Sequence, residues 1–275
     1  MSVKDNFLKY LPWLLIGLSI SYLSISLFLS YLIDILNIDI FGLYSWLSNT
    51  YTDPYFWMFM FIEASITEQI QWFYLILIQI IIMSYIIINH RKLSKLAALP
   101  WFLLFFGVYL MFLEDRFNIR HMGSKAIGSN LLREDVYSAA WETGFTRSSI
   151  ELSFYFILGI TMIIAFLMIL RNNPKKQQAK RFMLMGYLFY GTAAIASATR
   201  NIGNWYTVVG TRILGFIISG RELGWTATSS PSFSWKPFGF WFMDHLVEES
   251  LELFGVTFLL AAILIYLPLS KYHEE

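Results

Sequence analysis

The residues best suited to chemistry lie at 244–252, with the sequence Asp-His-Leu-Val-Glu-Glu-Ser-Leu-Glu. They open an apolar run that is long enough to cross a bilayer. Ionised side chains are costly in hydrocarbon, so they face a protein interior or a watery cavity and find partners there. On a helix, His245, Glu249 and Glu252 would share one face, because residues three, four and seven positions apart lie above one another. Glu248 can take the place of Glu249 on that face, which we predict to be the site.

A second polar stretch, Leu-Glu-Asp-Arg-Phe-Asn-Ile-Arg-His at 113–121, ends an earlier apolar run. If the helix continues through it, Glu114, Asn118 and His121 share a face that could meet the face of His245. Carboxylates and imidazoles on neighbouring helices are the ligands of divalent-metal sites in helical bundles. The predicted metal ligands are His245, Glu248, Glu249, Glu252, Glu114 and His121. A divalent metal is the candidate cofactor, and haem, with His121 and His245 as axial ligands, is the less favoured one.

Three uses of this cluster remain open. The same residues suit the relay of protons or small cations, and crowded carboxylates also suit general acid–base catalysis. A structural ion-pair network that holds loops to the bundle is the third use. The residues expected to support such ion pairs are Asp244, Asp115, Glu68 and Arg200. No residue can be assigned a catalytic role, and the sequence does not decide whether the protein is an enzyme.

The composition sets the class of the protein. The chain is 57% apolar and 14% charged, with a mean hydropathy of +0.55, whereas soluble domains are about 25% charged. The absence of cysteine excludes disulfides, thiolate metal ligands and iron–sulfur clusters. A net charge of +1 with scattered basic residues argues against binding to nucleic acid. We therefore predict an all-α, polytopic transmembrane helix bundle in contact with membrane lipid, forming one integral membrane domain over residues 1–275.

Apolar runs of about 20 residues predict about six spans. Long connections join them on one side, and these are expected to contain short interfacial helices. The predicted spans lie near residues 11–32, 70–88, 96–113, 152–170, 182–198 and 240–267.

The basic residues predict the orientation. Short connections at 90–95 and 171–181 are rich in Lys and Arg, and such loops mark the cytoplasmic side. Both termini are therefore expected in the cytoplasm, and a prokaryotic cytoplasmic membrane is the expected location. The charged ends of the spans, including the acidic stretch, then converge on the outer membrane boundary.

Three short pieces of the chain resemble a group of uncharacterised bacterial polytopic membrane proteins. The pieces are Glu-Gln-Ile-Gln-Trp at 68–72, Leu-Glu-Asp at 113–115 with His121, and Glu-Glu-Ser-Leu-Glu-Leu-Phe-Gly at 248–255. In that group, paired acids end one span and Glu-Glu-x-x-Glu-x-x-Gly begins the final span. The first piece departs from the pattern, because its tryptophan follows an amide-rich Gln-Ile-Gln. The resemblance implies where the site lies and implies no activity.

Three functions from different classes fit these observations. The first is an integral membrane protein with an acidic and histidine-containing site at the outer boundary, which binds a divalent metal or performs acid–base chemistry. The second is a non-catalytic subunit of a larger membrane complex, with other membrane proteins as partners. The third is a proton or small-cation transporter. The inner halves of the spans are nearly uncharged, with Gln79 as the main polar exception, which argues against a path across the membrane.

Overall fold

The computed structural model describes residues 3–50, 56–62, 64–119, 122, 145–172, 176–200, 202–218 and 238–267. Within these residues the protein is all-α and contains no strand. Six helical stretches are long and apolar enough to cross a membrane. The prediction of an integral, polytopic helix bundle is therefore confirmed. The stretches are Tyr10–Ile35, Phe59–Asn89, Lys95–Phe117, Leu152–Asn172, Gln177–Thr199 and Phe238–Tyr266.

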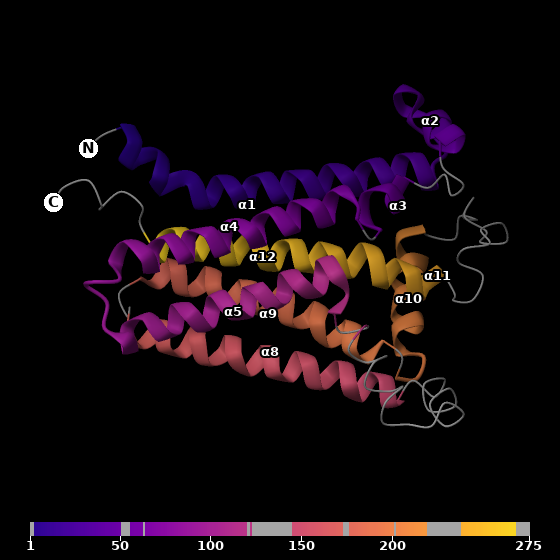
Figure 1. The fold of residues 1–275 in the computed structure, drawn as a ribbon. Helices are drawn as coiled ribbons and strands as arrows, with labels where there is room; N and C mark the ends of the chain where they lie inside the picture. Colours follow the sequence, from indigo (N-terminus) through magenta and orange to yellow (C-terminus); the bar gives the residue numbers. More distant parts are fainter. Residues whose placement is uncertain are drawn as a thin grey trace.

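The six long helices lie side by side and define two ends of the bundle (Figure 1). They are α1 (Val3–Ser30), α4 (Ile66–Asn89), α5 (Lys95–Phe117), α8 (Phe145–Asn172), α9 (Gln177–Thr199) and α12 (Glu248–Tyr266). At the basic end, α1 begins, α12 ends, and the basic connections follow α4 and α8. The opposite end, which we call the acidic end, carries the charged residues that open α12.

Helix α12 is the centre of the bundle. It contacts α1, α4 and α9, and it is the most buried of the six spans. Its contact with α9 is very close, because a side chain at Gly255 would meet the backbone nitrogen of Tyr190 at 2.8 Å. On the facing helix, a side chain at Gly186 would meet the carbonyl oxygen of Gly255 at 2.9 Å. Small residues let membrane helices approach in this way.

The half of the bundle toward the basic end is a packed apolar core. Five of its side chains, one from each of five helices, are completely buried: Ile82, Leu104, Ile169, Met183 and Ile263. At mid-depth, the Ser19 hydroxyl lies 3.0 Å from that of Thr257 and 3.5 Å from that of Tyr74. These hydroxyls satisfy one another within the interior of the bundle.

Short helices cover the acidic end. They are α2 (Leu43–Thr50), α3 (Phe56–Phe61), α10 (Trp205–Ile218) and α11 (Phe238–Trp241). The buried Asp34 carboxylate caps α3, accepting from the backbone nitrogens of Phe56 at 2.8 Å and Trp57 at 2.9 Å. Capping satisfies amide groups at the start of a helix that have no partner within it. Asp34 thus ties this short helix to the end of the first span.

Helix α10 runs across the direction of the long helices (Figure 1). A side chain at Gly210 would overlap the carbonyl group of Gly239, so the backbones of α10 and α11 touch. Short helices were expected in the long connections of this side, and α10 is one of them. This crossing holds α10 over the start of the last span.

Candidate functional site

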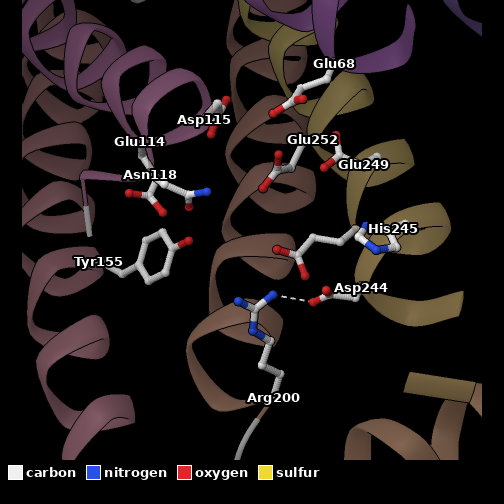
Figure 2. Close-up of a pocket in the computed structure, with 11 residues that line it drawn as sticks. Glu68, Glu114, Asp115, Asn118, Tyr155, Arg200, Asp244, His245, Glu249 and Glu252 are labelled. Atoms are coloured by element: carbon white, nitrogen blue, oxygen red, sulfur yellow. Dashed lines mark hydrogen bonds and ion pairs between the residues drawn. The ribbon is translucent and has the colours of Figure 1, made fainter. Parts of the chain in front are cut away.

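An acidic cavity of about 70 Å³ lies at the acidic end of the bundle (Figure 2). Its lining residues come from α4, α5, α8, α9 and the last span, so it forms only when the bundle assembles. The residues that line it are Glu68, Glu114, Asp115, Asn118, Tyr155, Arg200, Asp244, His245, Glu248, Glu249 and Glu252. We refer to it below as the acidic cavity.

The structure brings nearly all of the predicted site residues together. Five of the six predicted metal ligands line the acidic cavity, and so do all four residues expected to support ion pairs. The remaining predicted ligand, His121, lies outside the described residues. The charged residues that line the cavity thus lie together in space, although the sequence separates them into four segments.

A π-helical segment, Phe242–Val247, precedes α12 and changes the geometry predicted for the last span. A π-turn carries an extra residue and is frequently found at functional sites. It turns Asp244 and His245 toward the same cavity as Glu248 and Glu252. The simple 3.6-residue spacing expected for this face therefore holds from Glu248 onward and not before it.

Two indole rings hold the imidazole of His245. The ring of Trp241 is stacked on it, with centroids 5.3 Å apart and planes 9° from parallel. The ring of Trp57, from α3, lies 6.2 Å away on a tilted plane. These two contacts fix the position and orientation of the imidazole ring.

Gln71 joins three helices at the wall of the cavity. Its side chain is 0% exposed, and its Nε2 donates to Asp115 Oδ2 at 2.6 Å and to Glu252 Oε2 at 2.8 Å. From α9, the Tyr190 hydroxyl donates to Asp115 Oδ1 at 2.9 Å. One amide nitrogen therefore serves two carboxylates, which keeps like charges close together.

Glu248 and Asp244 have partners from the cap and from α9. The hydroxyl of Tyr206, on α10, donates to Glu248 Oε2 at 2.7 Å. Burial, with the neighbouring Glu248 charge, raises the pKa of Tyr206, so its hydroxyl stays protonated and remains a donor. Arg200, just after α9, forms an ion pair with Asp244, and both side chains are largely buried.

Glu68 has a structural task besides lining the cavity. Ser65 caps α4 by accepting from the Glu68 backbone nitrogen, and the Glu68 carboxylate accepts in return from the Ala64 backbone nitrogen. This reciprocal pattern resembles a capping box. The sequence Ser-Ile-Thr-Glu at 65–68 carries this signal, and it explains why α4 begins before the predicted span at 70–88.

Negative charge dominates the acidic cavity. Its described lining includes seven carboxylates, and Arg200 is the single Lys or Arg among these lining residues. Glu249 Oε2 is shielded from solvent and accepts no hydrogen bond from the described residues, and the same is true of Gln71 Oε1. Buried acceptors are normally satisfied, so these two atoms stand out, and Glu249 is the one of the two residues that lines the cavity.

A direct metal centre is not preformed in this arrangement. Within the part of the chain that the structure describes, no three His, Asp or Glu side chains converge closely enough to hold a metal ion. The helix was expected to continue to His121, but α5 ends at Phe117. Asn118 takes a left-handed conformation with φ of 52° and caps the helix by donating to the Glu114 carbonyl. The face predicted for Glu114 and Asn118 therefore does not form, although both residues line the cavity.

Several residues of the site are not apparent in the sequence. Gln71 lies one turn after Glu68 on α4, and this spacing could have identified it. Tyr155, Tyr190 and Tyr206 reach the site from helices that carry no local motif. Only the fold brings their hydroxyls to the carboxylates. Comparison with protein-family models, with curated proteins and with solved structures finds no match to this chain.

Proposed function

We propose that this integral membrane protein binds a cation in its acidic cavity and exchanges protons there. The observation that carries the proposal is the imbalance of seven carboxylates against one arginine in a cavity of about 70 Å³. At an effective dielectric constant near 20, two like charges 4 Å apart repel by about 4 kcal/mol. Full ionisation without a counter-charge would therefore cost much of a domain's stability, so protons or cations must offset it.

The geometry favours a cation held through hydrogen bonds or through water. A volume of about 70 Å³ has room for a few water molecules or a small charged group. A hydrated divalent ion meets carboxylates through its own waters and does not need three converging ligands. The metal ligands predicted from the sequence then serve as a ring of acceptors around the ion. The unpartnered Oε2 of Glu249 and the other carboxylates of the lining suit a donor that has several N–H or O–H groups.

Acid–base chemistry is a part of this proposal. Carboxylates that cannot all be ionised share protons, and groups that share protons can act as general acids and bases. His245 adds an imidazole to the lining, a side chain that serves as a general acid or base in many proteins. The described residues toward the basic end are a packed apolar core, and this supports a site that exchanges with one side of the membrane rather than a transport path.

The test is the thermal stability of the purified protein with and without cations. Chlorides of Mg²⁺, Mn²⁺, Zn²⁺ and ethylammonium should raise the Tm of the wild type. At a cation concentration 100 times its Kd the gain in stability is about 2.7 kcal/mol. Glu252→Gln keeps an oxygen that can accept from Gln71, so its cation-free Tm should equal or exceed that of the wild type, while the gain with cations falls.

Asp39→Asn is the matched control for Glu252→Gln. Asp39 is a carboxylate outside the cavity that accepts from the Tyr44 backbone nitrogen at 2.9 Å, so its variant should respond to cations as the wild type does. A wild type with no cation response, together with a large loss of stability in Glu252→Gln, would reject cation binding. That result would support a structural ion-pair network instead.

We also propose that the acidic end faces outward and that both termini are cytoplasmic in a prokaryotic cytoplasmic membrane. The basic residues at 90–95 and 171–181 support this orientation. A reporter fused after Lys180 should then read as cytoplasmic, and one fused at Ser230 should read as external. The opposite pair of readings would place the acidic cavity on the cytoplasmic side.

A further inference from the structure

A second hollow lies beside the acidic cavity. It is an apolar groove of about 440 Å³ between α8 and α9, a volume within the range of small-molecule sites. The buried side chains of Met111 and Leu259 form its floor, and the exposed rims include Phe156 and Ile195. Because its rims lie on membrane-spanning helices, the surroundings of this groove are lipid chains.

Two tyrosines connect the groove to the acidic cavity. Tyr155 lines both hollows, and its hydroxyl points toward the middle of the cavity (Figure 2). Tyr190 lines the groove, while its hydroxyl donates to Asp115 at 2.9 Å in the cavity wall. The apolar surface therefore ends where the carboxylates begin, so one molecule with an apolar part and a polar part can occupy both hollows.

The groove is open along its length. A side chain at Gly159 or Gly191, both of which line it, would find no atom within 4 Å. The contact between α9 and α12 is the opposite case, because Gly186 and Gly255 are there in near contact with the facing helix. Along α8 the groove extends from Leu152 to Ile163, a rise of about 16 Å at 1.5 Å per residue. Its shape suits an extended alkyl chain.

We propose that the occupant is a long-chain aliphatic amine, with its ammonium group in the acidic cavity and its alkyl chain in the groove. This rests on the proposed function, because it identifies the cation as the head group of an amphiphile. An ammonium carries three donors and one positive charge. It can donate to the unpartnered Oε2 of Glu249, which lines the cavity, and its charge complements the surrounding carboxylates.

The same charges exclude other lipid head groups. A phosphate or carboxylate head group would be repelled by seven carboxylates, and Arg200, the one arginine in the described lining, is already engaged with Asp244. A neutral alcohol would fill the groove with the same chain but would leave the charge of the cavity unbalanced. The proposal therefore predicts that an amine binds more tightly than an anionic or neutral lipid with the same alkyl chain.

The experiment uses the full chain in phosphatidylcholine nanodiscs and measures the rise in Tm with ligand concentration. The probes are dodecylamine, dodecanol with the same chain, and ethylammonium with the head group alone. Gly191→Leu adds a side chain at a position that lines the groove and whose Cβ would find no atom within 4 Å. Gly17→Leu is its control. Gly17 also has no atom within 4 Å of the added carbon, but it lies on α1 and does not line the groove.

Dodecylamine should stabilise the wild type at concentrations at which dodecanol does not. Gly191→Leu should weaken the binding of dodecylamine by about tenfold, which corresponds to the loss of two buried methylene groups. It should leave ethylammonium unchanged, and Gly17→Leu should leave both unchanged. Glu249→Gln should weaken the binding of dodecylamine and of ethylammonium, because it removes a negative charge from the cavity.

Two results would overturn the amine proposal. One is an equal response of Gly191→Leu and Gly17→Leu to dodecylamine, and the other is equal stabilisation by dodecanol and dodecylamine. If ethylammonium or a metal ion still raises the Tm in those cases, cation binding stands and only its amphiphile is wrong. If no cation raises the Tm of the wild type, both proposals fail.

Discussion

The two ends of the bundle solve the problem of helix packing in different ways. Toward the basic end, side chains such as Leu104, Met183 and Ile263 are fully buried and apolar, and they hold the helices by close contact. At the acidic end, the same helices are joined by Gln71, Tyr190 and other polar groups around like charges. The apolar packing carries no charge to offset, whereas the acidic cavity is lined by seven carboxylates and one arginine. We therefore expect packing to dominate at the basic end and the proposed cation binding to act at the acidic end.

The contact between α9 and α12 is where the largest change is expected. Gly255→Leu would push a side chain against the backbone of Tyr190, at 2.8 Å for its first atom. Backbone atoms cannot move aside as a flexible side chain does, so the two helices must separate, at a cost of about 3 kcal/mol or more. The measurement is the Tm and the yield of folded protein in detergent.

Gly17→Leu is the control for this substitution, because the added side chain meets no protein atom. Its Tm should match that of the wild type or exceed it slightly, since glycine weakens a helix. Cations should not restore Gly255→Leu, because the defect lies in packing and not in charge. Full recovery with cations would show that the apolar contact and the acidic cavity are not separate in the way described.

Substitution of Arg200 should cause the next largest loss of stability. The cause here is unbalanced charge, whereas in Gly255→Leu it is packing. Arg200→Met leaves Asp244 without its ion-pair partner in an acidic cavity. Removal of one partner of a buried pair costs about 3–5 kcal/mol, and the partial exposure of this pair lowers the expected loss to roughly 2 kcal/mol. The measurement is the free energy of unfolding with and without cations, and cations should reduce the loss.

Two further variants test the origin of that loss. Arg200→Met combined with Asp244→Asn should recover most of the stability, because the unbalanced charge is gone. Arg116→Met is the matched control: the Arg116 guanidinium lies 4.6 Å from the centre of the Trp72 ring, and the side chain does not line the cavity. Its loss should be under about 1 kcal/mol. A double variant as unstable as Arg200→Met alone would contradict the electrostatic explanation.

The ends of the helices show how far the sequence reaches. The fifth span was predicted at 182–198, and its helix covers Gln177–Thr199. The prediction succeeds because the membrane sets the length of an apolar run. The second span was predicted to start at residue 70, yet α4 begins at Ile66 and includes the charged Glu68. A charge ends an apolar run in the sequence, but a buried charge with partners does not end a helix.

The site was predictable by residue type and much less by geometry. The carboxylates stood out because their burial in a span needs a reason. The π-turn at Phe242–Val247 and the left-handed Asn118 depend on packing against other helices, and no local pattern specifies them. The Tyr190 hydroxyl meets Asp115 across 75 positions of sequence. Such a pair is visible only once the bundle is assembled.

The smallest expected effect comes from two tyrosines one turn apart on α9, and it sharpens the comparison most. Tyr190 donates to the Asp115 carboxylate at 2.9 Å, and Tyr187 donates to the Met162 backbone carbonyl at 2.7 Å. Each substitution by phenylalanine removes one hydrogen bond and should cost about 1 kcal/mol. The measurement is the free energy of unfolding of both variants, each with and without Mg²⁺ or ethylammonium.

The two losses should differ in their dependence on the cation. In Tyr190→Phe the cation can take over the missing donor to Asp115, so its loss should shrink when the cavity is occupied. In Tyr187→Phe the carbonyl of Met162 lies beside the apolar groove and away from the acidic cavity, so its loss should stay constant. Equal behaviour of the two variants would mean that the cation does not act near Asp115. Both variants replace a tyrosine of the same helix by phenylalanine. A difference between their cation responses therefore measures the effect of the charge in the acidic cavity.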